Sequence, residues 1–346
     1  MFWTPVDRWL VTLADPMGKL HARLPSRLDA EGLKRLINAA LNHGVLPAVL
    51  RHLQQHPETV LQNPEDFNAH RVSTGKILIE QAQLAMLLRQ QAAELLRTAR
   101  GRGMTMLVMK GPSFADAIYP EPGLRPFVDL DLLVERDHFR EAHTMMRELG
   151  YIEHDEEAMK YEDGYAETLM YRPDQPGGPA ELHWNLVNSP TLRRGLDVSL
   201  SDLQLEPDRV TPEDQPNLTA ASHLLITVVH AAASHGYDKL QMAIDILQLA
   251  RGAAGPIDTD WLQEAMANTG ATLALAVGLD LTARLYPHDP APRELLKQLD
   301  PRWSRFFWRR FVTPHLLITA RDDRRYWGSF RRQWLRHRLK RGRGIK

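Results

Sequence analysis

Residues 105–134 read TMLVMKGPSFADAIYPEPGLRPFVDLDLLV, with two short apolar runs on either side of a turn-rich segment. The first run, residues 106–109, stops at Lys110-Gly111-Pro112, which is typical of a strand that ends in a tight turn. Residues 113–119 have helical character, and a turn with two prolines and a glycine follows. The second run, residues 127–134, predicts another strand. This stretch therefore predicts strand, turn, helix and strand in that order.

Asp129 and Asp131 interrupt the second apolar run. Residues two apart in a strand point to the same face, so the two carboxylates should lie side by side, with Leu130 and Leu132 packed on the other face. Two like charges so close are unfavourable unless a cation lies between them. A divalent ion that prefers oxygen ligands, above all Mg²⁺, would satisfy both. The alternative is that the aspartates cap a turn or pair with surface lysine and arginine side chains.

A third carboxylate is expected near the aspartate pair. Residues 136–149 have the pattern of a helix, and residues 151–152 and 165–171 predict strands. Residues 180–186 predict a further strand, which places Glu181 and His183 on one face. We expect this strand to pair antiparallel with the aspartate strand and so to bring Glu181 beside the aspartates.

The order of several short motifs in residues 108–184 resembles that of a known family. Each motif is weak alone, whereas their order is fairly specific, and the resemblance extends over most of the chain. The family is the bacterial uncharacterised nucleotidyltransferases, a branch of the nucleotidyltransferase superfamily with the DNA polymerase beta-like fold. The matching motifs are Lys110-Gly111, Tyr119-Pro120, Arg125, Asp129, Asp131, Leu133-Val134, Leu149-Gly150-Tyr151 and Glu181-Leu182-His183-Trp184.

The resemblance implies that three carboxylates on adjacent strands are the catalytic and metal-binding residues, and these map to Asp129, Asp131 and Glu181. Nucleotidyl transfer places negative charge on the α-phosphate and on the departing pyrophosphate, while an acceptor hydroxyl loses its proton. Two Mg²⁺ ions would lower the barrier to both events. The expected reaction is Mg-dependent transfer of NMP from an NTP, expected to be ATP, to a hydroxyl of a small molecule, peptide, protein or RNA.

The expected phosphate-binding turn departs from the superfamily pattern. Lys110 and Gly111 stand where the superfamily usually has a Gly-Ser turn that cradles phosphates. A glycine lets backbone amides approach a triphosphate, and a lysine adds a point charge. Ser113 could supply the missing hydroxyl. The stretch from this turn to the aspartates is also longer than in better-known members.

Two further residues near the carboxylates each admit two interpretations. Arg125 could contact the β- or γ-phosphate of the nucleotide, or it could form an ion pair with Glu121 or Asp129. His183 could contact phosphate or support the metal ligands, or it could be a core histidine with satisfied hydrogen bonds. We count both among the candidate nucleotide-binding residues.

The segment HAAASHGYDKLQMAIDI, residues 230–246, resembles the corresponding family segment. Two histidines five residues apart are too far apart to hold a metal on one face of an α-helix, unlike histidines four apart. One interpretation is that His230, His235 and Asp245 support the packing of helices against the core. The other is that His235 and Lys239 line the acceptor or triphosphate side of a cleft.

The fold class expected from these patterns is α+β, with a small mixed sheet flanked by helical lobes. Residues 29–53 and 77–96 carry apolar residues at helical spacing, with Asp29 as a candidate N-terminal cap. The expected division is an N-terminal helical lobe at residues 1–102, a nucleotidyltransferase core at 103–200, and a C-terminal helical lobe with a basic tail at 201–346.

Composition restricts the possible chemistry and location. The 346 residues include no cysteine, which excludes disulfides, thiolate metal sites and cysteine nucleophiles. The first 16 residues are apolar but broken by charges and a proline, so they fit neither a secretory signal nor a transmembrane span. No other apolar run is long enough to span a membrane. We therefore expect a cytoplasmic protein.

The formal net charge of zero conceals a basic tail. Residues 321–346 contain eleven Lys or Arg against two Asp, so the tail carries +9 and residues 1–320 carry −9. Tryptophans are interleaved with arginines from residue 303 onward. This pattern is compatible with RNA binding, with an anionic membrane surface, or with a helix whose aromatics pack inward while its arginines are solvated. Phe330, Trp334 and Leu335 lie near one helix face, which fits the last interpretation.

Three function classes are compatible with these features. The first is an active nucleotidyltransferase, which the intact Asp129, Asp131 and Glu181 favour. The second is a catalytically degenerate member that binds a nucleotide or a partner, which the altered turn would permit. The third is an RNA-binding or tRNA-modifying protein that uses its basic tail. A metal-dependent phosphohydrolase could also use two aspartates, but the strand and turn context argues against it.

Overall fold

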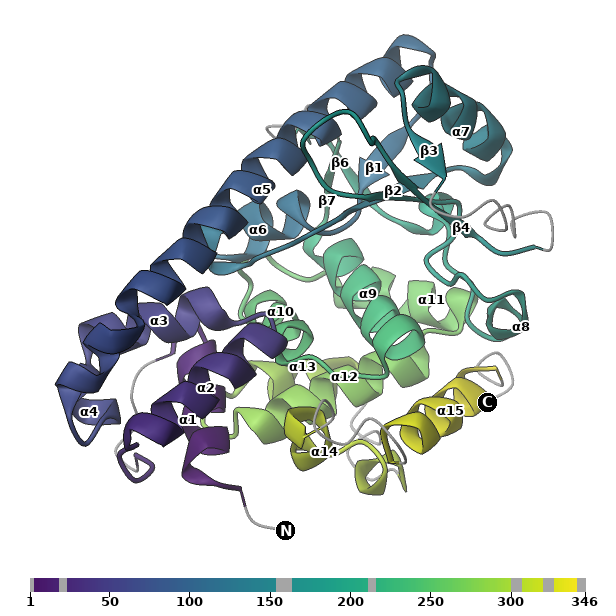
Figure 1. The fold of residues 1–346 in the computed structure, drawn as a ribbon. Coiled ribbons are helices and arrows are strands. Elements are labelled where there is room, and N and C mark those ends of the chain that lie inside the picture. Colours follow the sequence, from purple (N-terminus) through teal and green to yellow (C-terminus); the bar gives the residue numbers. More distant parts are fainter. Residues whose placement is uncertain are drawn as a thin grey trace.

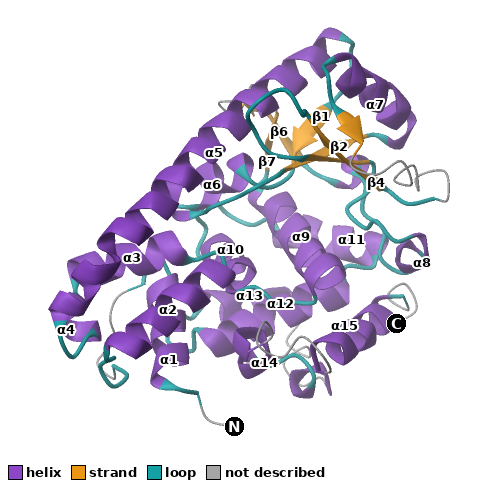
Figure 2. Cartoon of the chain, in the orientation of Figure 1, coloured by secondary structure: helices purple, strands orange, loops and turns teal. Residues whose placement is uncertain are grey.

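The computed structural model describes residues 3–18, 24–153, 164–210, 216–299, 307–319 and 327–340. It confirms the α+β class, because 62% of the structure is helical and the main sheet has five strands of mixed direction. Figure 1 shows this sheet at one end of the long helix α5 (Asn68–Gly101), with the C-terminal helices packed beneath it. Figure 2 shows how small the sheet is beside the helices.

The sheet has the order β1-β2-β5-β4-β3. β2 runs parallel to β5, and the other three pairs are antiparallel. The antiparallel pairing predicted for the Asp131 and Glu181 strands is therefore wrong, because the chain leaves β2 through helix α7 and returns through β3 and β4 before it forms β5. The strands are β1 (Met106–Val108), β2 (Leu130–Val134), β3 (Ile152–Glu153), β4 (Glu167–Tyr171) and β5 (Ala180–His183), and α7 spans Phe139–Glu148.

The aspartate strand is shorter than the apolar run that predicted it. β2 begins at Leu130, so Asp129 precedes the strand and Val128 is 60% exposed rather than buried. The reason lies in its partner, because β5 begins at Ala180, directly opposite Leu130. Residues 127–129 therefore have no neighbouring strand on that side to extend the ladder.

Two hydrophobic cores lie on opposite faces of the sheet. One contains Leu130 and Leu132 of β2 with the second half of α5 and helix α7. The other contains Leu133 together with helices of both lobes, so α1–α3 and the C-terminal helices share one core. Asp131 points to this second side, because it alternates with Leu130 and Leu132 along the strand. The sheet therefore presents its carboxylates toward the C-terminal helices.

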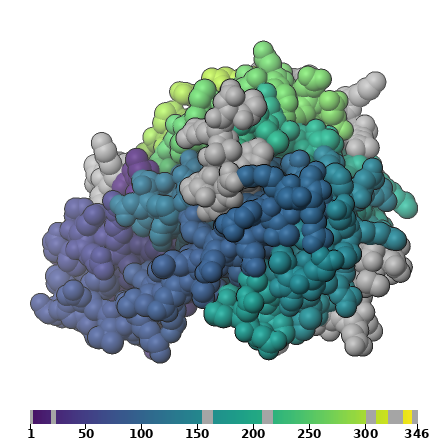
Figure 3. Space-filling view, turned by 90° about the horizontal axis from the view of Figure 1, so that it is seen from above, coloured from purple at the N-terminus to yellow at the C-terminus, as the bar shows by residue number. Residues whose placement is uncertain are grey.

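The N-terminal helices confirm the expected helical pattern. Asp29 caps α2 by accepting a hydrogen bond from the Gly32 amide at 2.8 Å. The first half of α5 leaves Val72 and Ile79 exposed, and Figure 3 shows this helix in blue across one face of the molecule. The helices are α1 (Pro5–Ala14), α2 (Ala30–Asn42), α3 (Leu46–Gln55), α4 (Pro57–Val60) and the 3₁₀ turn η1 (Pro64–Phe67).

The remaining elements build the region around the sheet and beneath it. A π-helical segment, η6 (Ala231–His235), continues α9 without a break. No helix in the described part of the chain is both long enough and apolar enough to cross a membrane. The elements are α6 (Pro112–Ile118), η2 (Pro122–Leu124), η3 (Arg136–His138), α8 (Pro190–Arg193), η5 (Leu200–Asp202), β6 (Leu205–Val210), β7 (Pro216–Leu218), α9 (Ala220–His230), α10 (Leu240–Ala250), α11 (Thr259–Thr269), α12 (Thr272–Leu285), α13 (Ala291–Leu299), η8 (Phe307–Arg310), α14 (Pro314–Thr319) and α15 (Trp327–Leu339).

Candidate active site

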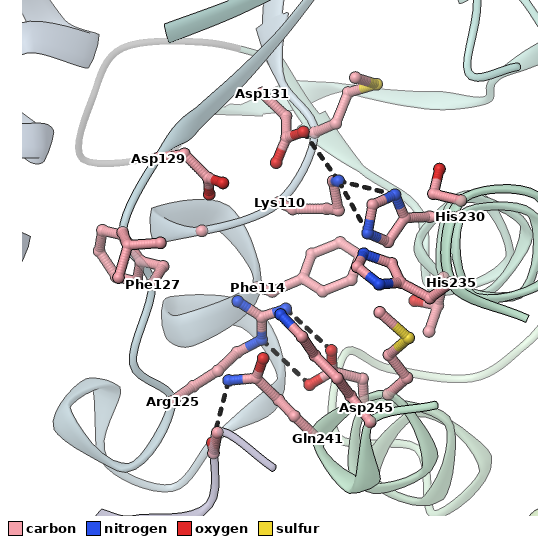
Figure 4. A pocket seen from close by; sticks show the side chains of 18 of the residues that line it. Lys110, Phe114, Arg125, Phe127, Asp129, Asp131, His230, His235, Gln241 and Asp245 are labelled. Atoms are coloured by element: carbon pink, nitrogen blue, oxygen red, sulfur yellow. Dashed lines mark hydrogen bonds and ion pairs between the residues drawn. The ribbon is translucent and has the colours of Figure 1, made fainter. Parts of the chain in front are cut away.

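A cleft of about 500 Å³ lies between the carboxylate face of the sheet and helices α9 and α10. Its size is typical of small-molecule sites. Figure 4 shows acidic and basic side chains converging on it from both sides. Nine of the ten candidate residues line this cleft: Lys110, Gly111, Arg125, Asp129, Asp131, Glu181, His183, His235 and Lys239.

One cluster in the cleft consists of Asp131, Glu181 and His183. Asp131 and Glu181 are direct neighbours across the parallel pair of strands β2 and β5. The His183 Nε2 atom lies 3.6 Å from Asp131 Oδ1 and 3.4 Å from Glu181 Oε2. One ligand atom from each of the three residues lies within 4.8 Å of the other two, as a shared metal ion would require.

Both ring nitrogens of His183 are buried without a hydrogen-bond partner. Buried polar atoms are normally hydrogen-bonded, so an imidazole that has ion-pair contacts with carboxylates but no hydrogen bond is a candidate ligand position. Burial disfavours a charge on this ring, but Asp131 and Glu181 outweigh burial and raise the pKa of His183 to about 10. Two carboxylates and one imidazole are ligands suited to a divalent cation, so the cluster fits a metal site.

Asp129 lines the cleft but stands outside this cluster. It lies at the turn before β2, and Figure 4 shows its carboxylate facing the same space as Asp131. Burial, followed by the negative charge of Asp131, raises the pKa of Asp129 to about 6. The two aspartates therefore interact electrostatically as predicted, although only Asp131 lies in the strand.

Lys110 supplies the cation nearest to Asp131. Its Nζ atom lies 2.8 Å from Asp131 Oδ1 and 2.9 Å from His230 Nδ1. Burial alone would raise the pKa of Asp131, but the positive charges of Lys110 and His183 hold it well below its usual range. Burial and Lys110 hold the pKa of His230 well below the usual value, so this ring is neutral and can accept a hydrogen bond from the ammonium group.

Gly111 forms the turn between β1 and α6. Its φ of +60° and ψ of −115° lie in a region that side chains with a Cβ rarely adopt. A Cβ here would also approach the Asp129 carbonyl oxygen to 3.4 Å. A contact of 3.4 Å is an ordinary one, so the backbone conformation rather than the available space favours glycine at this turn.

Arg125 takes neither of the ion-pair partners expected from the sequence. Its Nε and Nη2 atoms donate to the two carboxylate oxygens of Asp245 at 3.0 and 2.8 Å, while Glu121 pairs with Arg51. The Tyr119 hydroxyl donates to Asp245 Oδ1 at 2.7 Å. Asp245 belongs to α10, so this buried pair joins the segment before β2 to the C-terminal helices, as the packing interpretation of Asp245 predicted.

The π-helical segment brings His230 and His235 into ring contact, which the α-helical geometry assumed from the sequence did not predict. A π-helix has i→i+5 hydrogen bonds, so residues five apart come nearly into line. The rings of His230 and His235 are accordingly in edge contact, with centroids 4.8 Å apart. His230 belongs to the site because it contacts Lys110. The sequence interpretation did not predict this contact. His230 does lie in the segment that resembles the family, but no sequence pattern indicated the π-helix.

Ser113 is the one candidate site residue that does not line the cleft. Ser113 is buried and absent from the cleft lining, and its Oγ atom lies 3.5 Å from His223 Nε2. The hydroxyl expected to help hold phosphate therefore faces the core.

Lys239 lies at the cleft, as expected for a residue that lines it. Its positive charge lowers the pKa of Asp129, although burial has the larger effect and raises that pKa.

The basic tail is only partly within the described residues. Residues 320–326 and 341–346 lie outside them, as does the side chain of Phe330. Within α15, Leu335 and Leu339 are fully buried and Trp334 stacks on Phe311 with ring centroids 4.5 Å apart. This part of the tail is therefore a helix with a packed apolar face, as one of the three interpretations predicted.

Comparison with known proteins identifies the family. A family model described as "Uncharacterised nucleotidyltransferase" matches residues 29–287, which covers the sheet, the cleft and most helices of both lobes. Searches of curated proteins and of solved structures return no match. A family named for nucleotidyl transfer fits a cleft that combines metal-compatible carboxylates with several cations. The chain belongs to the uncharacterised nucleotidyltransferase family.

Proposed function

We propose that the protein is a metal-dependent nucleotidyltransferase that moves NMP from an NTP to a hydroxyl group of an acceptor. The observation that supports the proposal is the cluster of Asp131, Glu181 and His183, whose ring nitrogens are buried without a hydrogen bond. It lies in one cleft with Lys110 and Lys239, whose charges complement a triphosphate. Mg²⁺ is the proposed metal and ATP the proposed nucleotide.

Asp131 and Glu181 would hold the metal, with His183 as a third ligand after loss of its proton. Asp129 faces the same space and would complete a second ion position. A bound divalent ion neutralises charge on the α-phosphate and on the leaving pyrophosphate. The chain itself fixes where the carboxylates of Asp131 and Glu181 lie, because the strands that carry them, β2 and β5, are paired in the sheet.

The remaining cleft residues would orient the nucleotide. Once Asp131 holds a metal ion, Lys110 would no longer be needed to neutralise it. Its ammonium group would then contact a phosphate oxygen instead of Asp131. His230 accepts a hydrogen bond from Lys110 and so limits where the ammonium group can move. His235 and Lys239 would contact the triphosphate from the other side of the cleft.

The transfer itself balances as a single displacement. The acceptor oxygen forms a bond to the α-phosphorus, and the bond from that phosphorus to the bridging oxygen breaks. Pyrophosphate leaves with the bonding electron pair. The acceptor proton passes to Glu181, whose side chain is 30% exposed and therefore more accessible than that of Asp131 at 6%.

Calorimetric titration of each of the four NTPs, with and without Mg²⁺, tests the proposal. We expect one NTP to bind only with metal, and we expect an Asp129→Ala/Asp131→Ala variant to lose that binding. Asp137→Ala removes an exposed aspartate a few residues further along and is the matched control. Labelled NTP can then identify the acceptor. If no NTP binds the wild-type protein in a metal-dependent way, the proposal fails.

The ion pair between Lys110 and Asp131 favours one alternative. Lys110 neutralises Asp131, as it would in a degenerate member that binds nucleotide or a partner without catalysis. This alternative predicts NTP binding that is independent of Mg²⁺ and unaffected by the aspartate substitutions. The same titration therefore separates the two functions.

A further inference from the structure

A second cleft, of about 850 Å³, adjoins the first. Glu167 of β4 and Ser234 of the π-helical segment line both clefts, so the two spaces meet at this boundary. Glu167 is also the residue opposite His183 in the sheet, and its Oε2 atom lies 3.7 Å from His183 Nδ1. A molecule in the second cleft can therefore reach the acidic cluster by passing Glu167.

One wall of the second cleft is basic. Arg336 and His337 of α15 and Lys340, which directly follows the helix, are exposed and line this cleft. Among the described residues that line this cleft, Glu167 at the boundary is the only acidic one. The opposite wall offers neutral hydrogen-bonding groups, including Ser189 and Thr191. This arrangement suits an anion with oxygen acceptors.

α15 is fixed in place at this wall. Leu335 and Leu339 are fully buried in the core on the face opposite the basic residues. The Nε atom of Arg336 donates to the Ala233 carbonyl oxygen, within the π-helical segment, at 3.3 Å. The end of α15 lies so close to Gly195 that a Cβ there would collide with the backbone of Leu339. The basic wall is thus built into the fold.

The aromatic side chain on this wall is not free to stack on a nucleobase. Phe311 stacks on Trp334 at an interplanar angle of 9°, and the Arg338 guanidinium lies 5.9 Å from the Trp334 ring centroid. Single-stranded nucleic acids are usually held by exposed aromatic platforms. Of the two aromatic residues that line the cleft, Trp334 is already stacked and Tyr165 lies half-buried outside α15, so the basic wall presents charged groups for a small anion rather than a stacking platform.

We propose that the second cleft binds the acceptor, and that this acceptor is a small hydroxyl compound carrying a phosphate group. The phosphate would contact Arg336, His337 and Lys340, and the hydroxyl would extend past Glu167 toward Asp131 and Glu181. The position as acceptor rests on the proposed nucleotidyltransferase function, whereas phosphate binding by the cleft does not.

Titration with inorganic phosphate and with ribose 5-phosphate, in the absence of nucleotide, tests phosphate binding. We compare the full-length wild-type chain with Arg336→Gln and Lys340→Gln. Each loss of a charge-assisted contact should weaken binding on the order of tenfold. Arg338→Gln removes the same charge from the same helix outside the cleft lining, and we expect less than a twofold change.

Each outcome bears on the proposal. Loss of binding in Arg336→Gln and Lys340→Gln alone supports it. No binding, equal loss in Arg338→Gln, or unchanged binding in both Arg336→Gln and Lys340→Gln overturns it. A short single-stranded RNA that binds more tightly than ribose 5-phosphate, with the same variant pattern, overturns the small-molecule assignment. Because no nucleotide is present, these results stand even if the NTP titration described above shows no binding.

Discussion

Two buried ion pairs line the same cleft, and they are built differently. In the first, the carboxylate of Asp245 receives two hydrogen bonds from Arg125 and one from Tyr119. In the second, Asp131 has a close contact with Lys110, while the neighbouring His183 has no hydrogen bond at either nitrogen. A complete network rigidifies a structure, whereas an incomplete one leaves polar atoms for a ligand. We therefore assign the Asp245 pair to the contact between the segment before β2 and α10, and the Asp131 cluster to binding.

The largest effect on stability is expected at Asp245. Asp245→Ala leaves Arg125 buried without its counter-charge, so the free energy of unfolding should fall by about 3–5 kcal/mol. Urea unfolding followed by circular dichroism measures this. Asp116→Ala removes a partner of Arg89 from an ion pair that is about one quarter exposed, and should cost about 1 kcal/mol or less. Equal losses at the two sites would contradict the structural role of Asp245.

The next largest effect is expected on metal affinity at Asp131. Asp131→Asn keeps the shape of the side chain but removes its charge, and should weaken Mn²⁺ binding about a hundredfold, which corresponds to about 2.7 kcal/mol. Mn²⁺ is a paramagnetic probe for an Mg²⁺ site, so electron paramagnetic resonance can follow the titration. Asp245→Asn is the control and should change the affinity less than about twofold. If both variants lose metal affinity equally, the proposed division between the two pairs is wrong.

A pH-dependent effect should appear on the Asp245 side of the cleft. His223 packs on Phe114, and the guanidinium of Arg125 lies 5.1 Å from the centroid of that ring. Burial lowers the pKa of His223 to about 4. The unfolded chain therefore binds this proton first, and the stability present above pH 6.5 is lost as the pH falls toward about 4.

Urea unfolding between pH 7 and pH 5 measures this loss, with a slope of at most about 1.4 kcal/mol per pH unit from this group. His223→Gln should make the pH dependence shallower. His56→Gln removes an exposed histidine and is the control. An unchanged pH dependence in His223→Gln would show that this ring does not titrate on unfolding.

The same comparison explains what could be predicted from the sequence. Asp131 and Glu181 were recognisable because each interrupts an apolar strand pattern that local geometry can interpret. The Arg125–Asp245 pair could not be recognised in this way. Its partners lie 120 residues apart and meet only when α10 packs near the sheet. The parallel pairing of β2 with β5 depends on the path of the chain between them. The π-helix at His235 also left no local pattern, because π-helical turns differ from α-helix by a single extra residue.

The smallest effect is expected at Tyr119. Tyr119→Phe removes one of three donors from Asp245 while Arg125 still neutralises the carboxylate, so the free energy of unfolding should fall by about 1.5 kcal/mol. Tyr286→Phe is the control, because its hydroxyl donates to the uncharged carbonyl of Val11, and its loss should cost about 1 kcal/mol or less. If Tyr119 acts through Asp245, adding Tyr119→Phe to an Asp245→Asn variant should cost less than it does in the wild-type chain. Equal losses of unfolding free energy in the two backgrounds would mean that the Tyr119 hydroxyl does not act through Asp245. The hydrogen-bond network around Asp245 would then be no more complete than the one around Asp131.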